Sequence, residues 1–312
     1  MTGACLRSFL TLWLVLAGLG LPAQAQTTYT VTTDADAFLA TGSPDNPAGT
    51  DLTANNYGGA GTLVVAPPGS LKGEFQSVLR FNVDGAVALF NSSYGTNGWV
   101  ITGISLTLAS NYGTQGTQPN NPIFGVINGG NFVVEWMADD DWIEGTGNPA
   151  QPTSDGITYD SLPTLLADAH IPLCTNTYTP PGNNIQVTYS LPLQSDLVST
   201  IDSGGEVSFR FYAADSQIDY LFNSYFYGRG NQPLINVTAA PKLQLVSSYF
   251  TNGVFHLVGT GMANGQYQVQ VTTNLTTGWQ TLGTVSADGS GAMQFDDAAA
   301  TSRTMGFYRL VQ

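Results

Sequence analysis

The sequence predicts an all-β protein: an antiparallel jelly-roll or β-sandwich domain followed by a small immunoglobulin-like or fibronectin-like β-sandwich. Two observations support this fold class. Apolar runs are short and stand between Gly, Asn and Pro residues, as strands do in sandwiches and barrels. Charged residues make up only 10% of the chain, against about 25% in an average domain, so hydroxyl and amide groups are expected to cover much of the surface.

The chain begins with a stretch that has the features of a secretory signal peptide, residues 1–25. Arg7 precedes an apolar run, and Ala23-Gln24-Ala25 forms a small-residue cleavage pattern. This run is shorter than the roughly 20 apolar residues that a membrane-spanning helix needs, and no later stretch reaches that length. We therefore expect a secreted protein, extracellular or at the cell surface, without a transmembrane segment in the mature chain.

Predicted strands follow one another through the first two thirds of the chain. In residues 77–85, Leu79 and Phe81 alternate with Arg80 and Asn82, so the first pair is expected to face the core. The same rule sets Phe209, Phe211 and Ala213 against Ser208, Arg210 and Tyr212. Further predicted strands cover residues 28–40, 61–68, 99–111, 184–193 and 233–241. Helical periodicity is confined to residues 161–170.

A domain boundary is expected near Ala239-Ala240-Pro241. The jelly-roll domain would then cover residues 28–240 and the small sandwich residues 243–312. The second part contains three turn signals, at Asn252-Gly253, Asn264-Gly265 and Asp288-Gly289. These divide it into six or seven short strands, which is typical of a small sandwich.

The net charge limits the classes of ligand that this protein is expected to bind. Eight basic residues stand against 22 acidic ones, which gives a net charge of −14. Phosphate binding needs a basic surface, so nucleic acid is an improbable partner. A neutral or cationic ligand, or calcium, fits better. Apart from the predicted signal peptide, Cys174 is the lone cysteine, so no internal disulfide is expected and a small buried or half-buried side chain is the simplest interpretation.

Two blocks of the first domain resemble a known family. Residues 34–83 contain DADAFLATG, NNYGGAGTLVV and SVLRFNV, and residues 139–163 contain DDDWIEGTGNP followed by DSLP. Together with residues 222–239 they resemble DNRLRE-type (disaggregatase-related) jelly-roll domains of secreted bacterial and archaeal proteins. Tyr159 departs from the pattern, because a Trp is usual there. The resemblance implies a lectin-like fold associated with carbohydrate binding or with cell-surface and matrix attachment, and it transfers no ligand residues.

The last 70 residues resemble a short module that ends secreted proteins of environmental bacteria. The matching residues are Tyr267, Asn274, Leu275, Trp279, Leu282, Gly283 and residues 307–310. The resemblance implies an accessory role, with attachment as one option.

Acidic segments suggest two sites for a structural calcium ion. In ADDDWIEGTGNP, residues 138–149, the ligands would be Asp139, Asp141 and Glu144, although the spacing does not fit an EF-hand. The alternative is a solvated turn, with Trp142 packed in the core rather than stacked on a sugar. The second set is Asp34, Asp36 and Asn56, and its alternative is strand-end solvation and turn capping.

A sugar platform is predicted in the aromatic stretch DYLFNSYFYGRGN, residues 219–231. Exposed aromatic rings beside polar groups suit sugar binding. With Phe222 and Phe226 pointing inward, alternation would leave the neighbouring aromatics on the other face. These residues are also compatible with ordinary core or edge-strand roles. The predicted ligand-binding set is Tyr220, Tyr225, Tyr227 and Arg229.

Catalysis ranks third among the predicted functions. Glycoside hydrolysis needs two carboxyl groups on either side of a cleft. Acidic residues are abundant enough in this chain that those in residues 139–144 could imitate such a pair by chance. A lyase would combine Tyr212 or Tyr220 with Arg210, but Arg80 and Arg210 more simply each form a salt bridge with an Asp at a sheet face. No HExxH, GxSxG, GxxxxGK or zinc-type Cys/His spacing occurs. The sequence favours non-catalytic binding of an extracellular or cell-wall polysaccharide, and the rival hypothesis is a structural surface protein without a glycan ligand.

Overall fold

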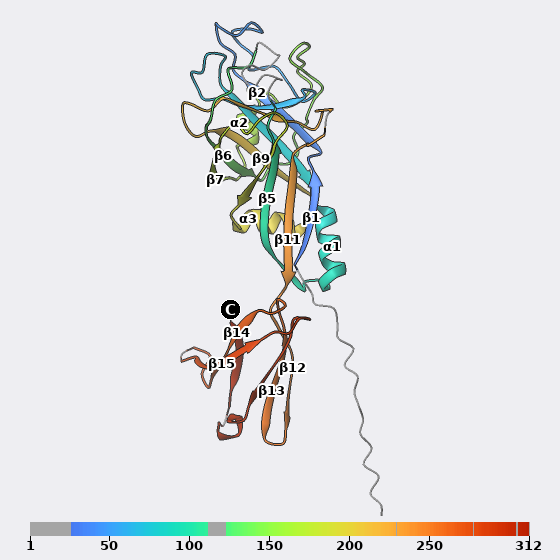
Figure 1. The fold of residues 1–312 in the computed structure, drawn as a ribbon, viewed down its shortest axis with the longest axis vertical. Helices are drawn as coiled ribbons and strands as arrows, with labels where there is room; N and C mark the ends of the chain where they lie inside the picture. Colours follow the sequence, from blue (N-terminus) through green and yellow to red (C-terminus); the bar gives the residue numbers. More distant parts are fainter. Residues whose placement is uncertain (1–25, 112–122, 229, 277, 304, 312) are drawn as a thin grey trace, which may run out of the picture. The chain divides into compact units, whose positions relative to one another are not determined.

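The computed structural model describes residues 26–111, 123–228, 230–276, 278–303 and 305–311 (Figure 1). They form two compact units, Gln26–Lys242 and Leu243–Gln312. Nearly all regular structure is antiparallel β-sheet, so the all-β sandwich prediction is confirmed. The predicted signal peptide lies outside the described residues. No described helix has the length and apolar character needed to cross a membrane.

The first unit is a sandwich of two large sheets. Its five-stranded sheet has the order β2 (Ala35–Ala40), β4 (Phe75–Asn82), β9 (Glu206–Ala213), β6 (Gly130–Met137) and β7 (His170–Tyr178). Its four-stranded sheet has the order β1 (Thr27–Thr32), β11 (Leu234–Pro241), β5 (Trp99–Ala109) and β8 (Gln186–Leu191). A two-stranded sheet pairs β10 (Tyr220–Asn223) with β3 (Thr62–Val65). The largest core cluster fills the space between the sheets.

The alternation predicted for β4 and β9 is confirmed. Leu79 and Phe81 are fully buried in this core, and Leu79 lies opposite Phe209. The other face of the five-stranded sheet is also covered. Val78 packs there against Trp142 and Leu165, because the segment that follows β6 folds back over the sheet. Every residue of β2 and the first five residues of β4 are therefore buried.

The sequence interpretation gives the helices incorrectly, both in length and in number. The helix expected at residues 161–170 is reduced to α2 (Leu162–Leu165), and His170 already begins β7. Two helices were not predicted: α1 (Asp84–Tyr94) buries Ala86 and Phe90, and α3 (Ser195–Ser203) buries Leu197 and Ile201. Each buries only two side chains, four residues apart, so the periodic signal is too short to recognise.

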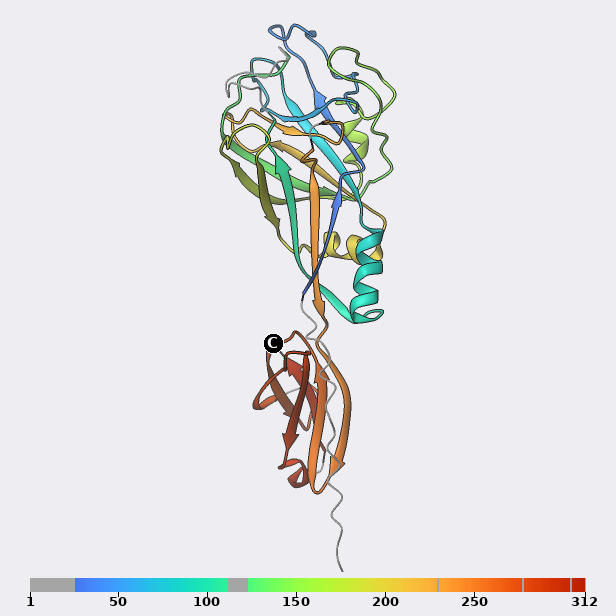
Figure 2. The same ribbon diagram turned by 45° about the vertical axis from the view of Figure 1, so that its right-hand side comes forward.

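Several loops gather at the end of this unit away from α1, among them those that follow β2 and β6 (Figure 2). Asn56 of the first loop forms a β-bridge with Thr153 of the second. The chain passes close here: a Cβ on Gly58 would lie 2.1 Å from the Glu144 carbonyl oxygen. The NNYGG turn, residues 55–59, therefore fits against residues 138–149, here called the acidic segment, because glycine has no side chain.

The second unit is a small sandwich of two three-stranded sheets. One has the order β12 (Gln244–Thr251), β13 (Val254–Thr260) and β16 (Ala292–Asp297), and the other β15 (Gln280–Ser286), β14 (Gln266–Thr272) and β17 (Phe307–Val311). A short 3-10 helix, η1 (Ala300–Ser302), precedes β17. Asn252 and Gly253 both have positive φ in the turn between β12 and β13, which is the geometry that an Asn-Gly hairpin turn requires.

Candidate functional site

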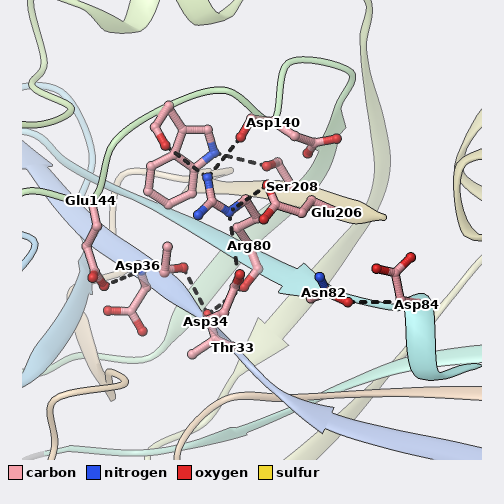
Figure 3. Close-up of polar contacts among 12 residues, drawn as sticks. Thr33, Asp34, Asp36, Arg80, Asn82, Asp84, Asp140, Glu144, Glu206 and Ser208 are labelled. Carbon is pink, nitrogen blue, oxygen red and sulfur yellow. Dashed lines mark hydrogen bonds and ion pairs between the residues drawn. The ribbon is translucent and has the colours of Figure 1, made fainter. Parts of the chain in front are cut away.

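Arg80 of β4 ties the acidic segment to the sheet (Figure 3). Its Nη1 donates hydrogen bonds to the carbonyl oxygens of Asp140 and Trp142, each at 2.9 Å. Its Nε lies 3.2 Å from a Glu206 carboxylate oxygen and 3.7 Å from that of Asp34. The predicted pairing of Arg80 with acids on the sheet face is confirmed. Asp34 thereby serves as an ion-pair partner in this structure.

Trp142 is a core residue. It is 7% exposed, its indole N–H donates to Ser208 Oγ at 2.9 Å, and the Arg80 guanidinium carbon lies 5.2 Å from its ring centroid. Asp140, beside it, has its pKa raised to about 6, chiefly by burial. The segment that opens with Asp139 thus packs Trp142 into the sandwich, while Asp141 and Ile143 face solvent.

The structure groups the predicted calcium-ligand residues differently from the two sets expected from the sequence. Asp36 and Glu144, assigned to different sets, lie together: Glu144 Oε1 accepts a hydrogen bond from the Asp36 amide at 2.7 Å. Burial raises the pKa of both carboxyl groups. Asp139 instead accepts the Asp141 amide at 2.9 Å in a local turn. Across the residues that the structure describes, no group of three or more His, Cys, Asp or Glu is placed to hold a metal. The calcium site stays a prediction.

Asn56 has a structural task that its sequence context does not reveal. Its side chain is fully buried, and its amide donates to the carbonyl oxygens of Glu144 and Ile157 at 2.6 and 2.8 Å. Its Oδ1 accepts the amides of Gly58 and Gly147, both at 3.1 Å. With both ends of the amide bonded to backbone, Asn56 holds two loops together.

The sugar-platform prediction is wrong for Tyr220. This residue is fully buried on β10 and packs against Phe132 and Tyr178 in the central core. Phe222 is buried too, as predicted. Phe226 is the opposite of the prediction, because it is 50% exposed. Strand alternation ends at Asn223, where β10 ends, so it gives no guide to the turn that follows.

Residues 224–228, here called the aromatic loop, present two exposed rings. Tyr225 is 40% exposed, and its ring meets that of Phe226 edge-on with centroids 5.2 Å apart. Tyr227 is half-buried. Arg229, the fourth predicted ligand residue, lies outside the described residues. The structure therefore keeps Tyr225 and Tyr227 at the surface and adds Phe226, which the sequence reasoning missed.

Buried polar groups fix the backbone of the aromatic loop. Asp36 Oδ2 accepts the Tyr225 amide at 2.7 Å, and the Gln232 side chain donates to the Tyr225 carbonyl oxygen at 2.7 Å. Ser224 Oγ accepts the Phe226 amide at 3.2 Å. Asp36 is 1% exposed and also contacts Glu144. Asp36 thus joins the aromatic loop to the acidic segment, because its carboxyl group accepts the Tyr225 amide and its own amide donates to Glu144.

A cavity of about 410 Å³ opens between the acidic segment and α2. We call it the acidic pocket. Trp142, Ile157 and Leu165 give it an apolar floor, and carboxyl and hydroxyl groups surround its mouth. Its volume is in the range of about 300 to 1,000 Å³ that is usual for small-molecule sites. Its lining residues are Asp139, Asp141, Trp142, Ile143, Ser154, Asp155, Gly156, Ile157, Ser161, Thr164 and Leu165.

The residues considered for a lyase do not form one site. Arg210 pairs with Glu135 at 3.3 Å and stacks over the ring of Tyr212 at 4.3 Å, while Tyr220 is buried in the core. His170 also contacts Glu135, at 3.1 Å. Burial and the nearby Glu135 raise the pKa of Tyr212 above its usual value, which opposes a role as a base near neutral pH. Arg210 forms the expected kind of ion pair, but its partner is Glu135 and not an Asp.

Comparisons with known proteins give no family for this chain. No family model and no curated protein matches it. Among solved structures, a Ruminococcus gnavus β-glucuronidase aligns with 93% of this chain and 42% of its own, at 8% identity and a TM-score of 0.21. A glycosyl hydrolase family 2 member from Bacteroides cellulosilyticus DSM 14838 aligns with 90% and 31%, also at 8% identity and 0.21. This chain spans less than half of either protein, and likeness at this level carries no argument about activity.

Proposed function

We propose that this chain is a secreted, non-catalytic protein of the cell surface or extracellular matrix that binds polysaccharide through the aromatic loop. The observation that carries the proposal is the exposure of Tyr225 and Phe226 on a backbone held by hydrogen bonds from the Asp36 and Gln232 side chains. Aromatic rings supply apolar contact for the C–H face of a sugar, and nearby polar groups orient it. A loop fixed before binding loses little conformational entropy when the ligand arrives.

Three further features support this assignment. The signal-peptide pattern of residues 1–25 suits an extracellular ligand. The resemblance to DNRLRE-type domains implies a lectin-like role. The sandwich core is complete without a cofactor, since aromatic and aliphatic side chains fill it. The loops at one end of the unit are then free to carry binding, which is where sandwich folds commonly place their ligand sites.

The test is isothermal titration calorimetry of the mature protein against a panel of neutral, amino-sugar and acidic oligosaccharides. We expect saturable binding to at least one of them, and a loss of tenfold or more in the Tyr225→Ala, Phe226→Ala double variant, because ring truncation in a binding centre commonly removes about 2 kcal/mol. Phe250→Ala removes an equally exposed ring, 53% exposed, from the second unit and should leave affinity unchanged.

Two results would contradict the proposal. Saturable binding that survives the double variant would place the ligand elsewhere. Release of new reducing ends or unsaturated products from a polysaccharide would make the protein an enzyme. The thermal midpoint of unfolding should be nearly the same in wild type and in the double variant, because both rings are exposed. A loss of binding in the variant would then not be caused by unfolding.

A structural surface protein without a glycan ligand is the second candidate. The observation that favours it is strand β12, an edge strand of its sheet whose eight residues are all exposed. Its exposed apolar side chains include Leu245, Val246, Tyr249 and Phe250. Free strand edges pair readily with other chains. Failure of every glycan to bind, together with attachment of the protein to cell-wall material, would favour this role.

A further inference from the structure

The residues around the acidic pocket divide into those that build it and those that are free to bind. Trp142 gives its indole N–H to Ser208, and Ser161 exchanges hydrogen bonds with Thr158. Asp155 accepts hydrogen bonds from the Thr153 hydroxyl at 2.5 Å, the Thr146 hydroxyl at 2.7 Å and the Thr146 amide at 3.0 Å, and these lower its pKa to about 2. These polar groups are already occupied, so they shape the pocket.

Three polar side chains at the mouth have no such role. The Asp141 carboxylate and the Ser154 and Thr164 hydroxyl groups make no hydrogen bond or ion pair with any other residue in the described part of the chain, and all three residues are exposed. They come from the acidic segment, from the loop beyond it and from α2. A ligand in the pocket would therefore meet the side chains of Asp141, Ser154 and Thr164 with their polar atoms free to bind it.

The charge of this pocket has one sign. Asp139, Asp141 and Asp155 line it, and its lining includes no Lys, Arg or His. Arg80, the cation in the network of Figure 3, directs its guanidinium to the Asp140 and Trp142 carbonyl oxygens and to acids on the sheet. An anionic sugar would be repelled here. An ammonium group would form a charge-assisted hydrogen bond with Asp141, the stronger class of hydrogen bond.

We propose that the acidic pocket binds a sugar unit with a free ammonium group, so that the protein prefers de-acetylated amino-sugar glycans over neutral or anionic ones. The C–H face of the sugar would pack on Ile157, Leu165 and the edge of Trp142. Its ammonium group would meet Asp141, and its hydroxyl groups Ser154 and Thr164. This inference rests on the proposed glycan-binding function: the aromatic loop would hold one part of the glycan, and the acidic pocket would be a second subsite that sets the ligand class, with Asp36 bonded to both segments.

The experiment compares glucosamine tetrasaccharide with N-acetylglucosamine tetrasaccharide, a neutral glucose tetrasaccharide and a galacturonic acid tetrasaccharide, at pH 6 where the free amine is protonated. We expect wild type to bind the glucosamine oligomer about tenfold more tightly than its acetylated form, which corresponds to the weaker end of a charged hydrogen bond. Asp141→Asn keeps the shape of the side chain and should remove most of this preference while leaving the acetylated oligomer unaffected.

The net charge of −14 attracts any cation, wherever it binds. The control variant must therefore remove one negative charge, as Asp141→Asn does, but at a position outside the pocket. Asp168→Asn does this, because Asp168 is exposed and lies outside the pocket lining. It should keep the full preference. Equal affinity of wild type for both oligomers, or equal effects of the two Asp→Asn variants, would overturn the inference and leave glycan binding intact. Absence of saturable binding to all four oligomers would overturn the proposed function as well.

Discussion

Asn56→Ala tests whether one buried amide holds the loop end of the first unit together. The substitution removes hydrogen bonds to the Glu144 and Ile157 carbonyl oxygens and to the Gly58 and Gly147 amides. At about 1 kcal/mol for each of these four bonds, the free energy of unfolding should fall by about 4 kcal/mol. A loss of this size in the free energy of unfolding is near the upper end of what a single substitution causes.

The neighbouring residue offers a matched control. Asn55 is half-buried and makes one side-chain hydrogen bond, to Tyr57 Oη at 3.2 Å. Asn55→Ala should therefore cost about 1 kcal/mol or less. Urea unfolding of the full chain can be followed by tryptophan fluorescence, because Trp99, Trp136 and Trp142 all lie in the first unit. A loss in Asn56→Ala within about 1 kcal/mol of that in Asn55→Ala would refute the reasoning.

The same measurement decides the calcium prediction for Asn56. If the amide serves backbone groups, the difference between wild type and Asn56→Ala will be the same with calcium and with EDTA. If Asn56 is a calcium ligand, EDTA will destabilise wild type but not the variant, because a ligand that binds only the folded state raises its stability. The difference would then shrink in EDTA.

Burial raises the pKa of Asp219 to about 7 and that of Asp140 to about 6, above the usual 3.8. The folded protein then binds more protons than the unfolded chain between about pH 4 and pH 7, so stability falls as pH rises through this window. Asp219→Asn should make the thermal midpoint less dependent on pH between 5 and 8, and an unchanged slope would contradict this. Gln194→Ala removes the α3 cap, whose Oε1 accepts the Asp196 and Leu197 amides at 2.7 and 3.0 Å. It should cost about 0.5 to 2 kcal/mol in urea unfolding, and a loss no larger than that of Ser199→Ala, on the exposed side of α3, would count against the cap.

Exposure of the aromatic loop was only partly readable from the sequence. Tyr225 and Tyr227 were predicted at the surface, but Phe226 was expected inside and Tyr220 outside. Period-2 alternation applies within a strand. Tyr220 belongs to β10, whose side chains are dry on both faces, and residues 224–228 lie beyond its end. A local pattern cannot show either circumstance, because both depend on which strands and loops cover β10.

The all-β class, the core faces of β4 and β9, and the Asn-Gly hairpin of the second unit follow from local sequence patterns. A strand repeats every two residues, and positive φ favours Asn and Gly. Long-range packing is needed to bond Asn56 to two distant loops, to bring Asp36 beside Glu144, and to place the segment after β6 over Val78, where it forms the acidic pocket. These contacts join residues up to 108 positions apart, and the chain brings them together only when the sandwich closes.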